Sequence, residues 1–160
     1  MTIKGVLFDA SGTLLRIESA QSWLRGVLDD RGIEASQAAA WQLYPDTLDV
    51  LRRLREQDVR IAVVSNVGWN WRPVFDAHGL TPYIDANVFS YEVGVDKPDP
   101  RIFQLACDRL GVDPAEALMV GDEQHKDGGA EAIGCRYLPV EHLPVESRPE
   151  GLRAVIEMVV

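Results

Sequence analysis

The sequence predicts an α/β fold built on a parallel sheet, and three observations support this. Five short apolar runs are rich in Val, Ile and Leu and are bounded by polar or turn residues, as is typical of strands buried on both faces. Segments with helical spacing of apolar residues lie between these runs. Strands that alternate with helices in this way form parallel sheets with right-handed crossovers. We therefore expect a three-layer α/β/α domain. The expected strands cover residues 3–8, 59–64, 86–89, 117–120 and 135–138.

The helices are expected between these strands and at the end of the chain. Leu48, Leu51 and Leu54 recur at helical spacing after the first strand. Gly111 and Gly134 directly follow two later patterns, at the position where glycine commonly ends a helix. The expected helices cover residues 47–57, 71–78, 100–110, 128–133 and 149–160. A chain of 160 residues has the size of one α/β domain with one core, so residues 1–160 are expected to form a single domain.

One segment, residues 16–44, does not fit the alternation of strand and helix. Apolar residues recur at helical spacing from Trp23 to Leu28, and an alanine-rich stretch follows a break at Gly32 and runs to Trp41. We expect a small helical hairpin, which is too short to fold as an independent domain. Trp23 and Trp41 are expected to be packing anchors of this hairpin, since large aromatic residues dominate small cores.

Composition narrows the classes of partner. The formal net charge of −9 argues against a nucleic-acid backbone or an anionic membrane, because an acidic surface repels both. No apolar run approaches the roughly 20 residues needed to cross a bilayer, and the N-terminus shows no signal-peptide pattern. Cys107 and Cys135 have no metal-ligand spacing and are expected to be small core residues in a reducing compartment, which indicates a cytoplasmic location.

Polar residues follow the ends of several expected strands. Asp9 comes directly after the run Val6-Leu7-Phe8, Ser65 follows a second run, and Asp122 follows a third. The carboxyl ends of parallel strands meet in one crevice, where open α/β sheets bind ligands. An aspartate held there can attack an electrophile such as phosphorus or an activated carbon.

Four short signatures in this order resemble those of the haloacid dehalogenase (HAD) superfamily. They are Val6 to Thr13, Val63 to Asn66, Lys97 to Pro100, and Met119 to Glu123 followed by Asp127. The resemblance implies a HAD-like Rossmannoid fold, in which residues 16–44 would be a reduced form of the helical cap. It also implies that Asp9 is the nucleophile, that Ser65 donates a hydrogen bond to an anionic oxygen, and that Lys97 neutralises both the attacking carboxylate and a transferred phosphoryl group. The alternative is an ordinary doubly wound domain with incidental acids at its turns.

The resemblance further implies a Mg²⁺ site. Asp9, Asp122 and the backbone carbonyl of Ser11 would be its ligands, and such an oxygen-rich set suits Mg²⁺. Asp127 is expected to support the metal or its waters, and Glu123 could do the same, although it is equally well explained as an acid at a helix N-terminus. Asn66 could add an amide donor beside Ser65, or simply cap a helix.

Ser11 departs from the family pattern and leaves the activity open. In family phosphatases the residue two positions after the nucleophile is an aspartate that acts as general acid and base, a contribution of about 10² to 10⁴ in rate. A magnesium-dependent phosphohydrolase with slow turnover is the first hypothesis, acting on a phosphorylated small molecule or macromolecule. A catalytically weak binding or regulatory domain is the second, and a dehalogenase-type hydrolase is the third.

Overall fold

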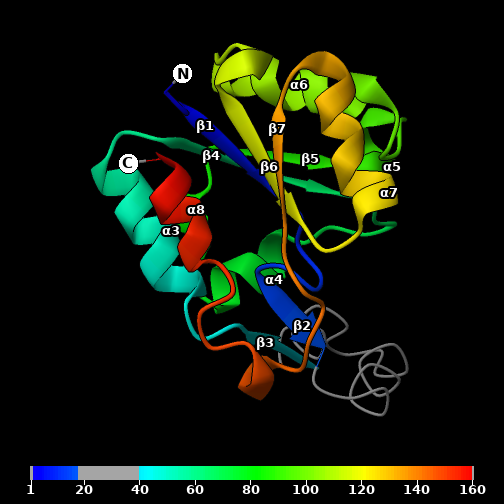
Figure 1. Cartoon of the computed structure of the whole chain (residues 1–160). Helices are drawn as coiled ribbons and strands as arrows, with labels where there is room; N and C mark the ends of the chain where they lie inside the picture. Colours follow the sequence, from blue (N-terminus) through cyan, green and yellow to red (C-terminus); the bar gives the residue numbers. More distant parts are fainter. Residues whose placement is uncertain (1, 18–39, 160) are drawn as a thin grey trace.

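The computed structural model describes residues 2–17 and 40–159, and its centre is a five-stranded parallel sheet (Figure 1). The strand order is β5-β4-β1-β6-β7, and every neighbouring pair is parallel. The strands are β1 (Gly5–Phe8), β4 (Arg60–Ser65), β5 (Ala86–Phe89), β6 (Ala117–Gly121) and β7 (Arg136–Pro139). All five runs that were expected to be strands are present, so the predicted parallel α/β fold is confirmed.

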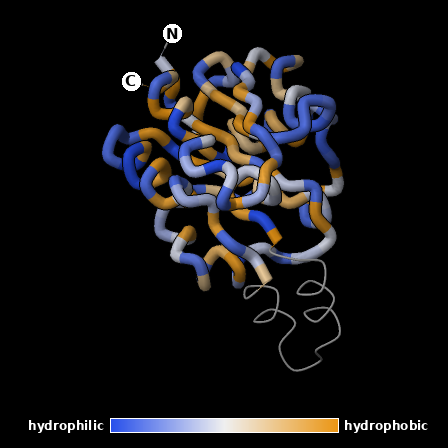
Figure 2. Tube along the Cα trace, turned by 60° about the horizontal axis from the view of Figure 1, so that its bottom comes forward, coloured by the Kyte–Doolittle hydropathy of each residue, from blue (hydrophilic) through white to orange (hydrophobic). Residues whose placement is uncertain are grey.

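Side chains alternate between the two faces of the sheet and build a separate core on each. On β1, Val6 and Phe8 pack into one core while Leu7 packs into the other. The same alternation on the neighbouring strands explains why their sequences are apolar throughout. The outer turns of the chain are mostly hydrophilic, and hydrophobic stretches gather in the interior (Figure 2).

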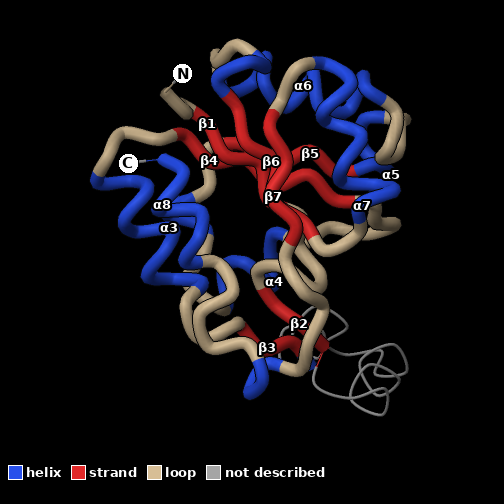
Figure 3. The backbone as a smooth tube through the Cα atoms, viewed as in Figure 1, coloured by secondary structure: helices blue, strands red, loops and turns tan. Residues whose placement is uncertain are grey.

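Helices cover both faces of the sheet, which gives the three expected layers (Figure 3). One layer contains α3 (Thr47–Glu56) and α8 (Arg153–Val159), and the other contains α6 (Pro100–Leu110). The remaining helices are short: α4 (Arg72–Ala77), α5 (Ser90–Val93), α7 (Gln124–Asp127), and the 3₁₀ segments η1 (Thr81–Tyr83), η2 (Pro114–Glu116), η3 (Gly128–Ile133) and η4 (Val145–Ser147). The helix expected over 128–133 is therefore a 3₁₀ segment, and the one expected over 149–160 begins at Arg153.

The described ends of the segment 16–44 are strands and not helices. Strands β2 (Leu15–Ile17) and β3 (Trp41–Leu43) form a separate antiparallel ribbon in which Leu15 pairs with Leu43 and Ile17 with Trp41. Strands of three residues are too short to show an alternating pattern, so they could not be predicted from the sequence. Residues 18–39, including Trp23 and the rest of the expected hairpin, lie outside the described residues.

Among the residues that the structure describes, no helix is both long and apolar enough to span a membrane.

Candidate active site

The predicted site residues meet at the carboxyl ends of three adjacent strands. Asp9 directly follows β1, Ser65 ends β4, and Asp122 directly follows β6. They line a cleft with a volume of about 180 Å³, whose other lining residues are Ser11, Asn66, Trp71, Lys97, Glu123, Lys126, Asp127 and His142. Strand order therefore explains how residues more than 100 positions apart share one cleft.

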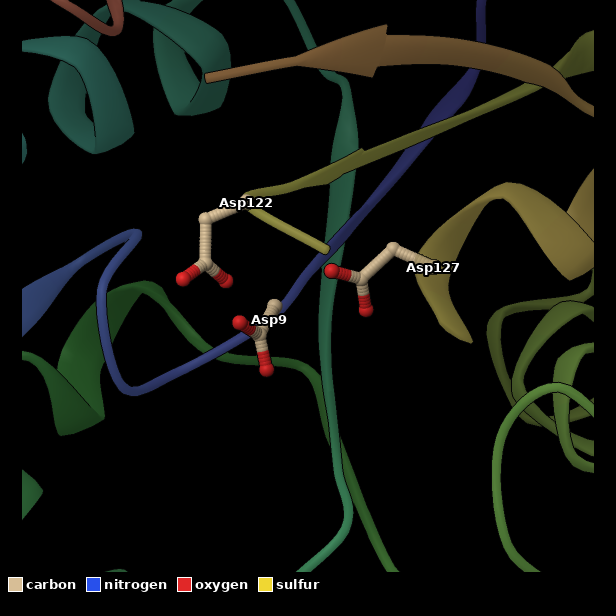
Figure 4. Close-up of side chains that lie close together, drawn as sticks. All are labelled: Asp9, Asp122 and Asp127. Carbon is tan, nitrogen blue, oxygen red and sulfur yellow. The ribbon is translucent and has the colours of Figure 1, made fainter. Parts of the chain in front are cut away.

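Three carboxylates form the acidic centre of this cleft. Asp9, Asp122 and Asp127 each offer an oxygen, and these atoms lie within 4.8 Å of one another. Figure 4 shows that the three side chains come from the end of β1, the end of β6 and helix α7. Gly121 allows this approach, because a Cβ atom at that position would collide with the Asp127 side chain.

Lys97 is the cation of the centre, and it is almost fully buried. Its Nζ lies 2.9 Å from Oδ1 of Asp9 and 2.6 Å from Oδ1 of Asp127. The exposed fractions of the Lys97 and Asp127 side chains are 3% and 1%, so solvent does not weaken this ion pair. Asp127 also accepts a hydrogen bond from the backbone N–H of Glu123. It therefore holds Lys97 in place, a role that the sequence did not predict.

Burial dominates the electrostatics of these groups. It raises the pKa of Asp9 from 3.8 to about 6, against the lowering effect of the Lys97 ammonium and with a further rise from Asp122. Burial also raises the pKa of Asp127. For Lys97, burial alone would lower the pKa, but the Asp9 and Asp127 carboxylates outweigh it and its pKa is raised. Lys97 is therefore charged at neutral pH.

Asn66 holds the loop that carries Lys97. Its Nδ2 donates to the Lys97 carbonyl at 2.9 Å, and its Oδ1 accepts from the Lys97 backbone N–H at 2.7 Å. This double hydrogen bond joins the end of β4 to a loop 31 residues later. Asn66 thus positions Lys97, which differs from both the donor and the helix-cap roles considered from the sequence.

The loop after β1 brings Ser11 and Gly12 to the cleft. Ser11 is exposed and lines the cleft, and the hydroxyl of the buried Thr13 lies 3.3 Å from Oδ2 of Asp9. Gly12 has a φ of +83°, and a Cβ atom there would collide with the side chains of Asp122 and His142. Only glycine fits this left-handed backbone and this close approach.

His142 and Arg148 reach this part of the site from the C-terminal segment, and sequence reasoning missed both. Nδ1 of His142 lies 2.6 Å from Oδ2 of Asp122, which fixes that carboxylate. Arg148 is buried, donates to the carbonyls of Gly12 and Thr13, and stacks over the Tyr44 ring at 3.3 Å from its centroid. Neither contact has a local sequence signal, because each joins positions at least 20 residues apart.

The donor set fits a hard divalent cation. Asp9, Asp122 and Asp127 present carboxylate oxygens, and Mg²⁺ is typically bound by one or two carboxylates together with waters. Glu123 lies on the rim of the cleft, where its Oε2 pairs with Nζ of Lys126 at 3.1 Å, so it does not belong to the three-carboxylate centre.

The doubly wound α/β sheet places the buried aspartate–lysine centre at its carboxyl edge, where open α/β sheets bind ligands. A profile of the family described as haloacid dehalogenase-like hydrolase matches residues 25–134, more than half of the chain. The chain belongs to this family. The matched stretch includes Ser65, Lys97, Asp122 and Asp127, and it begins after Asp9.

Individual relatives include both dehalogenases and phosphatases. The chain is 39% identical over 102 residues to (S)-2-haloacid dehalogenase 1 of Pseudomonas sp. (strain CBS-3), covering 62% of this chain and 44% of the relative. It is 37% identical over 103 residues to phosphoserine phosphatase of Thermus thermophilus, covering 63% and 41%. A solved HAD phosphatase from Thermococcus onnurineus superposes with a TM-score of 0.72 at 26% identity, covering 87% of this chain and 86% of the other. The chain thus spans less than half the length of the dehalogenase and of the phosphoserine phosphatase.

Proposed function

We propose that this protein is a Mg²⁺-dependent phosphohydrolase with Asp9 as its nucleophile. The observation that carries the proposal is the cleft in which Asp9, Asp122 and Asp127 gather, with the buried Lys97 paired to Asp9 and Asp127. Mg²⁺ would be held by Asp9, Asp122 and the Ser11 carbonyl, with Asp127 in support, and would neutralise charge on a phosphoryl group. Similarity to phosphatases such as phosphoserine phosphatase and glyceraldehyde 3-phosphate phosphatase supports a phosphate ester as substrate.

The chain's own residues supply the rest of the chemistry. A carboxylate oxygen of Asp9 attacks phosphorus, the ester oxygen leaves, and an aspartyl-phosphate forms. Water then attacks the phosphorus and returns the Asp9 carboxylate and free phosphate. Lys97 Nζ stabilises the charge on both the nucleophile and the transferred group, and the Ser65 hydroxyl donates to a phosphoryl oxygen.

The proposed active site lacks the aspartate that transfers protons in family phosphatases. At position 11, where family phosphatases carry an aspartate, the chain presents a serine hydroxyl, which is a poor general acid or base near neutral pH. We therefore expect slow turnover and a preference for substrates with good leaving groups.

The magnesium site is testable by calorimetry. Asp122→Ala removes one of the proposed ligands, so the affinity for Mg²⁺ should fall at least about 10- to 100-fold. Asp108→Ala, an exposed acid on α6, is the matched control and should bind Mg²⁺ as the unaltered chain does. Equal affinity in the Asp122 variant and the unaltered chain would remove the proposed site.

Ser11→Asp tests whether the missing acid and base limit the reaction. The residue is exposed at the cleft, so a carboxylate has room there. Turnover of an alkyl phosphate should rise by up to about 10²- to 10⁴-fold, while formation of the aspartyl-phosphate from p-nitrophenyl phosphate should change little because its leaving group needs little protonation. Ser11→Asn is the control: asparagine has about the size of aspartate but cannot act as a general acid or base, so this variant should show no gain in turnover. The enzyme hypothesis fails if both the unaltered chain and Ser11→Asp bind Mg²⁺ but neither shows Mg²⁺-dependent turnover. In that case the protein is a binding or regulatory domain.

A dehalogenase-type hydrolase, the third hypothesis from the sequence, is an alternative enzyme activity. The observation in its favour is Ser11, because dehalogenating members also lack the second aspartate, together with the similarity to (S)-2-haloacid dehalogenase 1. Halide release from a 2-haloacid without added Mg²⁺, in the absence of phosphatase activity, would select this candidate.

A further inference from the structure

The Ser65 hydroxyl lies at the buried floor of the cleft and has one fixed partner. Its exposed fraction is 4%, and its Oγ lies 3.1 Å from Nε1 of Trp71. The indole N–H can only donate a hydrogen bond, so the serine oxygen is the acceptor in this pair. Within the described part of the chain, the hydroxyl hydrogen of Ser65 has no protein acceptor. It is therefore available to a ligand in the cleft.

Trp71 is held rigidly by other aromatic rings. Its exposed fraction is 2%, and its ring lies edge-on to Trp41 at a centroid distance of 4.6 Å. It also contacts Trp69 at 4.4 Å and stacks on Phe75 at 5.5 Å. Aromatic contacts of this kind fix ring orientation. The Trp71 N–H is consequently directed at Ser65 before any ligand arrives.

A serine hydroxyl rotates about its Cβ–Oγ bond to suit its partners. Once one lone pair of Oγ is occupied by the Trp71 N–H, fewer rotamers remain for the hydrogen. A donor whose orientation is set in advance needs no reorganisation when negative charge appears beside it.

We propose that Trp71 is a positioning residue of the site, which orients the Ser65 hydroxyl toward an oxygen of a tetrahedral oxyanion such as a phosphoryl group. This inference rests on the proposed phosphohydrolase function and adds a residue that lies outside the four signatures. Trp71 acts through Ser65 and has no chemical step of its own.

A double-mutant cycle separates this role from packing. Trp71→Phe keeps a ring in the stack and removes the N–H, so inorganic phosphate binding in Mg²⁺ and kcat/KM for p-nitrophenyl phosphate should each fall roughly 3- to 10-fold. In the Ser65→Ala background the same substitution should have no further effect, because the hydroxyl that it orients is gone. An equal loss in both backgrounds would overturn the proposal, as would no loss in the unaltered background.

Two further variants guard against a packing artefact. Trp69→Phe changes the same aromatic stack without touching the Ser65 hydrogen bond, and it should keep the phosphate affinity of the unaltered chain. If Trp71→Phe does not fold, replacement of Trp71 by 3-benzothienylalanine preserves the ring shape and lacks the N–H, and the same loss is expected. Phosphate binding that is absent in the unaltered chain would overturn the proposed function, whereas normal binding with no Trp71 effect would overturn only this inference.

Discussion

Replacing Asp9 with asparagine is expected to abolish turnover and, at the same time, to stabilise the metal-free fold at neutral pH. Loss of the nucleophile should lower activity on the order of 10⁴-fold or more. The gain in stability has a different cause. Asp9 has an exposed fraction of only 9%, and burial raises its pKa from 3.8 to about 6, so the folded chain favours the neutral carboxyl group.

The sign of the pH dependence follows from that raised pKa. The stabilising contribution of the Asp9 carboxyl is fully present below pH 3.8 and is lost as the pH rises through about 6. The difference between these two values corresponds to about 3 kcal/mol, and this figure already includes the attraction between Asp9 and Lys97. The advantage of Asp9→Asn should therefore be present at pH 7.5 and absent near pH 4.

Urea unfolding in EDTA at both pH values measures this effect. Asp108→Asn, a change of the same type on the exposed face of α6, should alter neither stability nor activity. A variant Asp9→Asn that is less stable than the unaltered chain at pH 7.5 would contradict the assigned burial cost.

Replacing Lys97 with methionine should give the largest loss of stability. The substitution keeps an unbranched side chain of nearly the same length but removes the cation between Asp9 and Asp127, two carboxylates with side-chain exposures of 13% and 1%. Leaving buried charges without a partner costs about 3–5 kcal/mol. Turnover should also fall by about 10²- to 10³-fold or more, because the donor that stabilises the transferred group is lost.

The pH dependence and a second substitution identify the cause. Without Lys97 the pKa values of both carboxyl groups rise further, so the loss of stability should grow as the pH rises and shrink toward pH 4. Adding Asp9→Asn to Lys97→Met should recover part of the loss. Lys4→Met is the control, since Lys4 pairs with Glu116 at an exposed surface and should contribute no more than about 1 kcal/mol. A loss that is the same at all pH values would indicate a packing defect instead.

Much of the fold could be predicted from sequence because the central strands are buried on both faces. Continuous apolar runs are the direct consequence of that burial, and each of the five runs became a strand. The β2 and β3 ribbon could not be predicted, since its pairing joins Leu15 to Leu43 and each strand is only three residues long. An α-helix and a short 3₁₀ helix have similar sequence patterns, so the 3₁₀ conformation over 128–133 could not be predicted either.

The candidate site could likewise be predicted only in part from the sequence. Asp9, Ser65 and Asp122 could be placed together because each lies at the end of a predicted parallel strand, and Lys97 followed from its signature. The Asp127 pairing with Lys97, the Trp71 hydrogen bond and the contacts of His142 and Arg148 depend on side-chain directions in three dimensions. No spacing along the chain encodes them. The Mg²⁺ ligation, the supporting role of Glu123, the reduced cap and the cytoplasmic location stay predictions.

Arg148 joins the loop beside Asp9 to a segment far along the chain. Its contacts to the carbonyls of Gly12 and Thr13 span 136 and 135 residues, so the loop beside Asp9 receives its final support from the far end of the described chain. Contacts of such long sequence separation form slowly, because the intervening chain must first be ordered. During synthesis, a chain that has not yet exposed residue 148 carries every carboxylate of the cleft but lacks this support for the loop. The carboxylates alone therefore do not complete the cleft, because the loop beside Asp9 also depends on Arg148.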